Sequence, residues 1–427
     1  MTAAVDIKGW CPGARRPMPS GDGLIVRVRP HGGALQVAAL RDLAEAAQRF
    51  GSGQIDLTRR ANLQIRGVAA EGLPPLWELM ASLALLDDSA EQEAIRNIVI
   101  TPLAGLDPAE LLDMRPIAAT LETLLAADRS LLALPAKFGF ALDGGGVLTL
   151  ADLAADIRLV ACVQHDQACV AVGVAGRDGV VWLGTTAVAD AAAVAMQLAR
   201  SMLQHSPTRR AAALPPEAIA ALRAGPGLDA LDAIAMVSAA AEPQQRRGAF
   251  ALTEQACAVG FGAPFGRVDS DMLVRLAALL ETYAISEVRL SPWRTLYVAA
   301  DRSHAGPLVA GAARLGLIVD DVDPLMRIDA CSGAGGCPST SLAVRAHARL
   351  LAGAMARARF AGTLHVSGCA KGCARSAAAD LVLIGDGRRY RIVRNGTVKS
   401  EPCGSLDPAD LDLAGAGLFE AREKADV

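Results

Sequence analysis

The chain has few aromatic residues and lacks any long apolar run. Phe, Trp and Tyr make up only 4% of its 427 residues although 52% are hydrophobic, so alanine and aliphatic side chains must fill the core. No stretch approaches the roughly 18 uninterrupted apolar residues of a membrane span. The first ten residues contain no apolar segment of the secretory kind. We therefore expect a chain that neither crosses a membrane nor carries a secretory signal.

An excess of charge of one sign is also missing. The chain has 42 basic and 45 acidic residues and a formal net charge of −3, which argues against general nucleic-acid binding. Any anion must therefore be bound by a local cluster of arginines. No Gly-x-Gly-x-x-Gly follows a strand and there is no P-loop, so nicotinamide electrons would have to arrive through a partner protein. His-x-Asp/Glu, the usual start of a non-haem iron site, occurs nowhere.

Four of the nine cysteines form two motifs near the C-terminus. Cys331 and Cys337 enclose five residues in Cys-Ser-Gly-Ala-Gly-Gly-Cys-Pro, and Cys369 and Cys373 enclose three in Gly-Cys-Ala-Lys-Gly-Cys-Ala-Arg. Zinc sites usually have gaps of two to four residues and matched knuckles. The unequal gaps in glycine-rich turns fit zinc poorly and favour four thiolates around a [4Fe–4S] cluster.

The remaining cysteines do not indicate a disulfide framework. An odd total with four assigned to metal is typical of a protein of the reducing cytoplasm. Cys162, Cys169 and Cys257 lie in apolar, strand-like runs, where we expect them to be small buried hydrophobic residues.

The chain repeats itself at a constant offset. A helical stretch over 35–50 leads into a strand, turn and strand over 54–68, and the same order returns over 271–283 and 286–298. Leu57, Leu63 and Ile65 correspond to Leu290, Leu296 and Val298, and Leu40 and Leu43 to Leu273 and Leu276. A further strand is expected before each copy, at Gly23–Arg29 and Ala249–Val259. The pattern indicates an internal duplication of a half ferredoxin-like unit.

The repeat and the proline-rich stretch between its copies divide the chain into five expected segments. The polar, proline-rich stretch over 211–248 is expected to connect two halves. We expect a first ferredoxin-like half-domain over 1–75, an α/β domain over 76–210, a second half-domain over 249–310 and a cluster domain over 311–427. Strands are expected at Ala94–Thr101, Ala136–Leu142 and Leu159–Val174, and a helix at Ser339–Arg359. The fold class is α+β, with duplicated ferredoxin-like half-domains each followed by a larger α/β domain.

These features resemble the sulfite/nitrite reductase superfamily over nearly the whole chain. The two cysteine motifs are specific for the superfamily. The opening Gly9-Trp-Cys-Pro-Gly-Ala-Arg-Arg-Pro-Met-Pro-Ser-Gly-Asp-Gly-Leu24, the segment Asp56-Leu-Thr-Arg-Arg-Ala-Asn-Leu-Gln-Ile-Arg66 and Leu290-Ser-Pro-Trp-Arg-Thr-Leu296 are similar to its cobalamin-pathway branch. The resemblance implies that Cys331, Cys337, Cys369 and Cys373 hold a [4Fe–4S] cluster. It also implies a second centre, either sirohaem, which the fourth thiolate would bridge, or a non-haem iron of unassigned ligands.

The resemblance also implies a basic, tetrapyrrole-binding set of residues. Arg60 matches the arginine that opens the anion-binding strand, Arg96 a second basic residue, and Lys137 the first lysine of a Lys-x-Lys pair whose second position is Gly139 here. Guanidinium groups bind carboxylates in bidentate geometry, as a polycarboxylate substrate requires. The expected binding residues are Arg60, Asn62, Arg66, Arg96, Lys137 and Arg294. Arg59 is equally consistent with a solvated surface charge.

The implied activity is oxygen-dependent hydroxylation of precorrin-3A at C20 with lactone formation. Its partners would be precorrin-3A, dioxygen and an external donor, a reductase or ferredoxin drawing ultimately on NADH. One alternative is a sirohaem sulfite or nitrite reductase, which the missing lysine at Gly139 disfavours. The other is a non-catalytic iron–sulfur electron carrier, which would have no use for an arginine-rich pocket.

Overall fold

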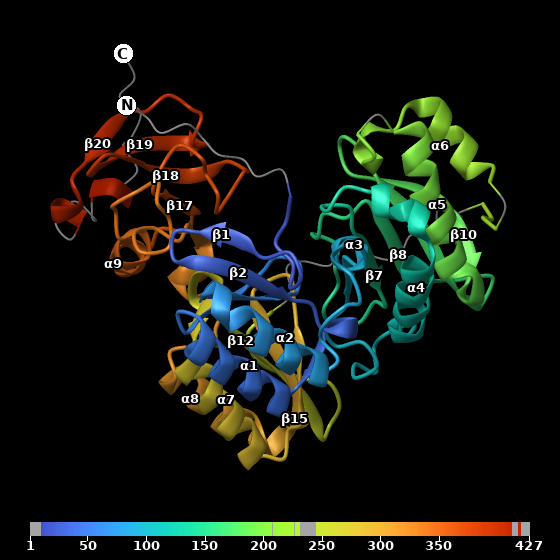
Figure 1. Cartoon of the computed structure of the whole chain (residues 1–427), viewed down its shortest axis with the longest axis horizontal. Coiled ribbons are helices and arrows are strands. Elements are labelled where there is room, and N and C mark those ends of the chain that lie inside the picture. The colour runs from blue at the N-terminus through green and yellow to red at the C-terminus, as the bar shows by residue number, and fades with distance from the viewer. Residues whose placement is uncertain (1–9, 207, 226, 231–244, 412–416, 420–427) are drawn as a thin grey trace.

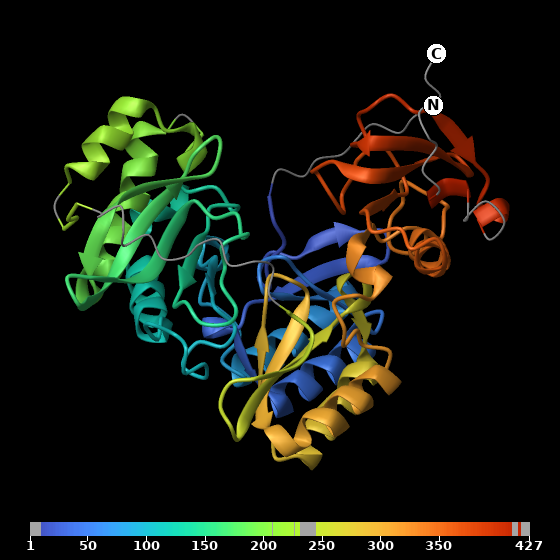
Figure 2. The same cartoon turned by 180° about the vertical axis from the view of Figure 1, so that it is seen from behind.

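The computed structural model describes residues 10–206, 208–225, 227–230, 245–411 and 417–419. Three lobes are visible in Figure 1 and, from behind, in Figure 2. The two repeats together form the central lobe, and the two α/β domains form the others. Within the described residues no helix is long and apolar enough to cross a membrane.

The two repeats contain the same elements, displaced by 233 residues to within one residue. The first comprises β2 (Gly23–Val28), β3 (Ala34–Gln36), α1 (Val37–Phe50), β4 (Gln54–Leu57), β5 (Leu63–Val68) and α2 (Leu73–Ser82). The second comprises β12 (Ala256–Gly262), β13 (Arg267–Asp269), α7 (Ser270–Thr282), β14 (Glu287–Leu290), β15 (Thr295–Asp301) and α8 (Ala305–Arg314). Short edge strands β1 (Met18–Ser20) and β11 (Gly248–Ala251) complete the two sheets.

The repeats exchange a strand with each other. β13 of the second repeat pairs with β4 of the first, with Val268 opposite Ile55, and β3 of the first pairs with β14 of the second, with Val288 opposite Leu35. The sheet orders are therefore β1-β2-β5-β4-β13 and β11-β12-β15-β14-β3. Helices α1 and α7 pack together, and the apolar side chains of both repeats form one continuous core.

The two α/β domains also share a topology. The first has the strands β6 (Ile98–Ile100), β7 (Phe140–Asp143), β8 (Ile157–Gln164), β9 (Gln167–Ala175) and β10 (Val180–Ala187). The C-terminal domain has β16 (Ile328–Ala330), β17 (Leu364–Ser367), β18 (Ala379–Asp386), β19 (Arg389–Gly396) and β20 (Gly404–Leu406). In both sheets the strands follow chain order, the first three are parallel and the rest antiparallel.

Helices cover these sheets and close the cores. The first domain contains α3 (Ala90–Ile95), α4 (Arg115–Ala127), α5 (Ala191–His205) and α6 (Pro216–Arg223), and the C-terminal domain contains α9 (Val344–Arg357). Each domain has its own apolar cluster. The helix expected over 339–359 is therefore present but begins at Val344.

Several expected elements differ in detail. The strand expected over 94–101 is only β6, because α3 continues to Ile95. The run over 159–174 is the hairpin β8–β9, which turns at His165 and Asp166, both with positive φ (52° and 58°). A two-residue turn of this kind usually carries Asn-Gly, so His165-Asp166 cannot be recognised as a turn from the sequence pattern. In the expected connector over 211–248, α6 occupies residues 216–223, and residues 231–244 lie outside the described ones.

Candidate functional site

The two cysteine motifs meet at one edge of the C-terminal sheet. Cys331 directly follows β16 and Cys369 lies two residues beyond β17, and these strands are parallel neighbours. Parallel strands end at the same edge of a sheet, so both loops emerge together. The backbone N–H of Gly368 donates to Cys331 Sγ (3.2 Å), and Cys331 N–H donates to the Val366 carbonyl (3.2 Å).

Glycines give the two loops their close turns. Gly333 and Gly372 have positive φ (70° and 61°), a conformation that other residues adopt rarely. A Cβ at Gly368 would come within 2.5 Å of Thr340 Cγ2, so only glycine fits between the loops. The glycine-rich sequence is thus explained by the approach of the two cysteine loops to each other.

The four thiols influence one another electrostatically. Burial raises the pKa of the Cys331 and Cys373 thiols, and the neighbouring cysteines raise both pKa values further. A bound cation reverses this preference, because it deprotonates a coordinating thiol. In the described part of the chain no three His, Cys, Asp or Glu side chains converge on a point that would hold a single metal ion. Four thiolates at this unequal sequence spacing suit a cluster, in which each binds a different iron, better than a single zinc ion.

Arg66 connects the first repeat to the loop between Cys331 and Cys337. Its guanidinium makes two 2.8 Å bonds to the Asp22 carboxylate and donates from Nη2 to the Gly336 carbonyl (3.2 Å) and to Ser20 Oγ (2.9 Å). Nη1 lies 3.3 Å from Asp56. Because its side chain is only 5% exposed and fully engaged, Arg66 acts as a structural bridge in this conformation rather than as a free cation.

A cavity of about 560 Å³ lies between the two repeats, a loop of the first α/β domain at 152–154, and residues 325–329 and Arg375 of the C-terminal domain. Its volume falls in the ordinary range of small-molecule sites. Six arginines and only two aspartates are among its charged lining residues (Arg59, Arg60, Arg246, Arg247, Arg294, Arg375, Asp152 and Asp329). The protein as a whole has a net charge of −3, so the positive charge is concentrated in this cavity.

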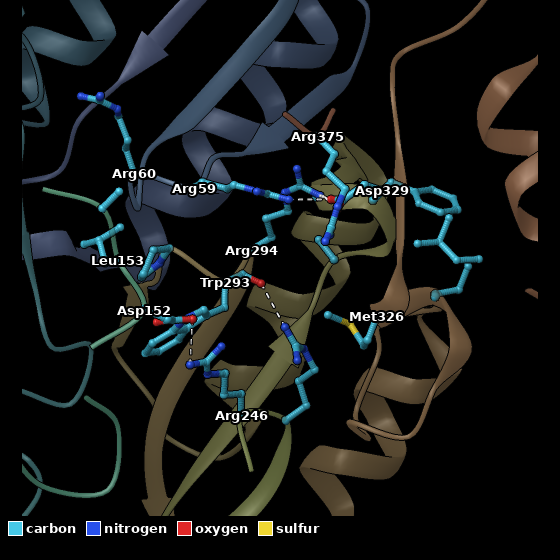
Figure 3. Close-up of a pocket in the computed structure, with 18 residues that line it drawn as sticks. Arg59, Arg60, Asp152, Leu153, Arg246, Trp293, Arg294, Met326, Asp329 and Arg375 are labelled. Atoms are coloured by element: carbon cyan, nitrogen blue, oxygen red, sulfur yellow. Dashed lines mark hydrogen bonds and ion pairs between the residues drawn. The ribbon is translucent and has the colours of Figure 1, made fainter. Parts of the chain in front are cut away.

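Asp329 organises one side of the cavity. Figure 3 shows Arg59, Arg294 and Arg375 converging on its carboxylate, at 2.6, 3.5 and 3.0 Å. Burial alone would raise the pKa of Asp329, but the three guanidinium groups hold it below the usual range. Three arginines share one carboxylate, which leaves donors for a second anion.

The opposite side of the cavity is closed by Trp293. The guanidinium of Arg246 stacks over its ring at 4.1 Å from the centroid, and the indole N–H donates to Asp152 (3.2 Å). Arg246 also pairs with Asp152 at 3.1 Å, as Figure 3 shows. Arg247 donates to the Trp293 carbonyl (3.0 Å). A loop of the first α/β domain is therefore fastened to the second repeat at the cavity.

Two of the residues expected to bind substrate, Arg60 and Arg294, line this cavity. Arg60 Nη2 donates to the Lys137 carbonyl (2.8 Å), and a Cβ at Gly139 would lie 3.9 Å from Arg60 Nη1. The position of the missing second lysine is therefore beside Arg60. The Lys137 side chain is exposed, and Asn62 is buried in the turn after β4, where its N–H donates to Thr58 Oγ1 (3.3 Å).

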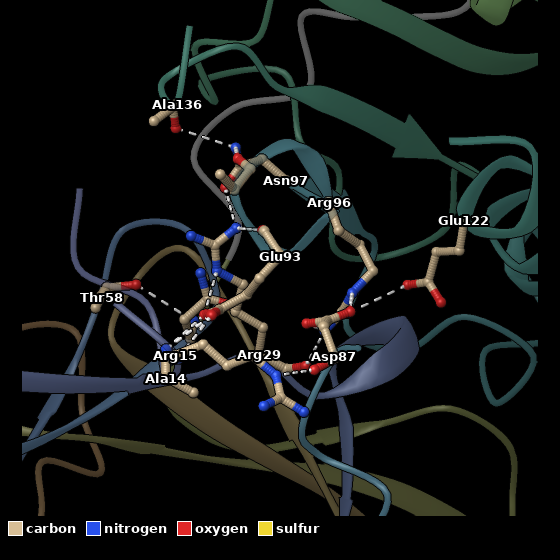
Figure 4. A network of polar contacts seen from close by, with 12 residues as sticks. Ala14, Arg15, Arg29, Thr58, Asp87, Glu93, Arg96, Asn97, Glu122 and Ala136 are labelled. Atoms are coloured by element: carbon tan, nitrogen blue, oxygen red, sulfur yellow. Dashed lines mark hydrogen bonds and ion pairs between the residues drawn. The ribbon is translucent and has the colours of Figure 1, made fainter. Parts of the chain in front are cut away.

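Arg96 lies in a different place. It makes two 2.8 Å bonds to Asp87 and donates to the Arg29 carbonyl (2.9 Å). Glu122 is 3.7 Å away. Figure 4 shows this network, in which Glu93 also accepts from the backbone N–H groups of Ala14 and Arg15. Arg96 lines a separate pocket of about 210 Å³ that is rich in carboxylates, so its charge is already balanced.

Sequence reasoning missed several cavity arginines. Arg246 and Arg247 lie in the polar run that the sequence predicts to be a connector, and Arg375 follows Cys373 by two residues. The adjacent pair Arg246-Arg247 just before a strand is the signal that could have found them. Arg59, which could equally have been a solvated charge, is 57% exposed and still reaches Asp329.

Comparisons with known proteins identify both kinds of domain. The family described as the nitrite/sulfite reductase ferredoxin-like half domain matches twice, at residues 16–83 and 252–310. The nitrite and sulphite reductase 4Fe-4S domain matches residues 91–191, a segment that precedes the four motif cysteines. The duplication and the fold class expected from the sequence are confirmed.

Individual relatives agree with the family matches. The chain is 32% identical to a precorrin-3B synthase of Sinorhizobium sp, over 98% of this chain and 89% of the relative. It is 27% identical to the ferredoxin–nitrite reductase of Synechococcus elongatus, over 87% and 77% of the two chains. The solved structure of the Mycobacterium tuberculosis NirA protein superimposes with a TM-score of 0.72 at 19% identity, covering 95% of this chain and 82% of that one.

Proposed function

The chain belongs to the nitrite and sulfite reductase superfamily of oxidoreductases, and we propose that within it the protein acts as a precorrin-3B synthase. The proposed reaction hydroxylates precorrin-3A at C20 and forms a lactone from the ring A acetate. It uses dioxygen and electrons from an external reductase or ferredoxin. The observation that carries this proposal is the arginine-lined cavity between the repeats.

The charge of the cavity suits a tetrapyrrole acid. A precorrin carries several acetate and propionate groups, and each can accept two parallel hydrogen bonds from a guanidinium. Arg59, Arg294 and Arg375 are already oriented by Asp329, so less side-chain entropy is lost when they bind a carboxylate. Trp293, with the Arg246 guanidinium stacked on its ring, adds a flat surface on the other side against which a macrocycle can pack.

We propose that Cys331, Cys337, Cys369 and Cys373 bind the iron–sulfur cofactor that the family match supports. When bound, the cluster supplies single electrons next to the cavity, and sirohaem or a second iron would supply the oxygen chemistry. The protein's own part is to hold the substrate carboxylates. Asp329 lies two residues before Cys331, and Arg375 lies two residues after Cys373. The segments that carry these cysteines therefore also contribute residues to the cavity wall.

Metal analysis tests the ligand assignment. Replacing Cys331 or Cys373 by alanine should sharply lower the iron and acid-labile sulfide content of anaerobically purified protein. The matched control is Cys403→Ala, an exposed cysteine outside both motifs. Full iron and sulfide content in the quadruple variant would refute the assignment.

Sulfite or nitrite reduction is the second candidate, because Arg60 lines the cavity as the resemblance to the reductases implies and because reductases are among the relatives. Against it, glycine stands beside Arg60 where a lysine would add a further cation. An electron carrier would need no such cavity at all.

One assay separates the candidates. A single preparation with a strong reductant is given precorrin-3A under labelled dioxygen, and separately sulfite and nitrite. We expect the label to enter the tetrapyrrole and no useful turnover of the anions. Rapid sulfide or ammonia formation without label in the tetrapyrrole would establish the reductase instead.

A further inference from the structure

Two cysteines outside the proposed cluster face each other across the β8–β9 hairpin. Cys162 and Cys169 are directly opposite in the antiparallel register, and their Sγ atoms are 3.0 Å apart. Opposed residues in such a pair have Cα atoms about 4.5 or 5.5 Å apart, and both values lie within the range that a disulfide requires. Both thiols are free in this structure.

The hairpin holds this pair in place. Its two-residue turn at His165 and Asp166 brings the strands together only three residues from Cys162. Beyond the pair, Gln164 donates from Nε2 to the Ala230 carbonyl (3.0 Å) and accepts from Thr185 Oγ1 (3.1 Å). The turn and Gln164 fix the strands on the tip side of the cysteines, and the strand pairing from Ala161↔Val170 to Ile157↔Val174 fixes them on the other side, so the thiols stay in contact without other chain movement.

The surroundings of the two thiols are unequal. Cys162 is fully buried, yet it lies outside the apolar cluster that forms the core of its domain, whereas Cys169 is partly exposed. Burial first, and then the neighbouring thiol, raise the pKa of Cys162 to about 12. Cys169 is therefore the thiol that a dissolved disulfide can reach. Cys162 would then attack the mixed disulfide formed on Cys169.

We propose that Cys162 and Cys169 form a dithiol/disulfide redox site that reacts with small-molecule disulfides. Cys169 attacks one sulfur of the oxidant and releases one thiol, which gives a mixed disulfide. Cys162 then attacks the Cys169 sulfur and displaces the second thiol. The protein loses two electrons and two protons, and the disulfide oxidant becomes two thiols that carry them.

Peptide mapping tests this on the intact, cluster-loaded protein. Trypsin places both cysteines, and no other, on the peptide 159–177. After treatment with oxidised glutathione under anaerobic conditions, followed by alkylation, this peptide should be lighter by two hydrogens than the dithiol and should carry no alkyl group. Cleavage before Asp166 should leave its two halves joined until a reductant is added.

Controls define the outcome that overturns the proposal. Cys257, which is buried without a cysteine opposite it, should show only alkylation once the protein is denatured. In Cys169→Ser the loss of two hydrogens should disappear. The proposal is wrong if the wild-type peptide remains a dithiol in excess oxidised glutathione, or if it carries glutathione on Cys169 with no link to Cys162.

Discussion

Arg294 occupies a backbone conformation that most residues avoid. Its φ is 58°, and the equivalent residue of the first repeat, Ala61, has a φ of 52°. A non-glycine residue in this region costs about 1–3 kcal/mol, and such strain is commonly found at functional sites. Glycine would accept the same turn without strain. An arginine here makes sense if its guanidinium is needed in the cavity.

The variant Arg294→Gly separates binding from stability. Losing a charge-assisted hydrogen bond to a substrate carboxylate should cost about 1.5–3 kcal/mol, or roughly a 10- to 150-fold increase in Kd. The thermal midpoint should stay level or rise, because the strain is relieved. Titration of a tetrapyrrole acid against Arg294→Gly and against Arg275→Gly, an exposed site on α7, measures the effect. Equal affinity in both variants would remove Arg294 from the binding site.

Glu110 should make stability depend on pH. Burial raises its pKa from 4.5 to about 7, although the Gly105 N–H (2.7 Å) and the Thr101 hydroxyl (3.1 Å) donate to it. Since the folded pKa is above the unfolded one, the stability contribution is complete below pH 4.5 and is lost as the pH rises through 7. Glu110→Gln, which keeps the shape without the charge, should flatten Tm between pH 5 and 8. Glu254→Gln on an exposed turn should leave the slope unchanged, and a slope that survives in Glu110→Gln would assign it to another group.

Individual residues also mark where sequence reasoning stopped. Arg66 and Arg96 have the charge and the position expected of binding residues, yet in the structure Asp22 and Asp87 engage them. Asp22 is 44 residues from Arg66 and lies in the turn Ser-Gly-Asp-Gly. No periodicity or motif reports such a pairing, because it depends on how two loops pack.

At the scale of elements, the segments that follow the first two strands carry different functional groups in the two α/β domains. In the C-terminal sheet the loops after the first two strands carry the cysteines. In the first sheet the corresponding edge carries Asp107 and Glu110, in the loop after β6, and Asp143, the last residue of β7. Their carboxylates accept backbone hydrogen bonds from Val147, Gly105, Gly145 and Leu150. The same edge of the fold is therefore filled by carboxylate–backbone bonds in one copy and by thiols in the other.

The bridge from β5 to the cysteine loop makes a prediction at this scale. Arg66→Met removes every bond to Asp22, Ser20 and Gly336 and leaves the largely buried Asp22 carboxylate without its guanidinium partner, while Asp56 keeps Arg267; this should cost about 3–5 kcal/mol. Because the loop before Cys337 loses its support, the cluster should also be lost faster on exposure to a chelator. The double variant Arg66→Met/Asp22→Asn should recover part of the stability. If the single variant keeps wild-type stability and cluster lifetime, the bridge is not structural.

The helices and strands could be predicted from the sequence more accurately than the pairing between the strands. The common offset of Leu40, Leu57 and Leu63 with Leu273, Leu290 and Leu296 gave the duplication correctly, because buried positions keep their spacing in both copies. The exchange of β3 and β13 was not foreseen, since three-residue strands carry no readable period. The cavity residues come from seven separate segments, and spacing along the chain could not predict that these segments meet.

For the whole molecule, strand exchange means that neither repeat is a folding unit. Ser270 N–H donates to the Gly53 carbonyl (2.8 Å), and at the equivalent place Val37 N–H donates to the Ser286 carbonyl (2.7 Å). The start of each main helix is thus fixed by the other repeat. The two α/β domains have separate apolar clusters, so they depend on the central lobe less for stability than for position.

Symmetry-equivalent leucines test this coupling. Leu40 in α1 and Leu273 in α7 are fully buried in the shared core, and truncation of either to alanine should cost about 2–5 kcal/mol. If the repeats unfold together, Leu40→Ala should accelerate hydrogen exchange in α7 as much as in α1, and Leu273→Ala should do the converse. Leu121→Ala, in the core of the first α/β domain, is the matched control and should affect that domain first. Faster exchange confined to the mutated repeat would show that each repeat is stable alone, and the cavity between them would then be able to open without unfolding either one.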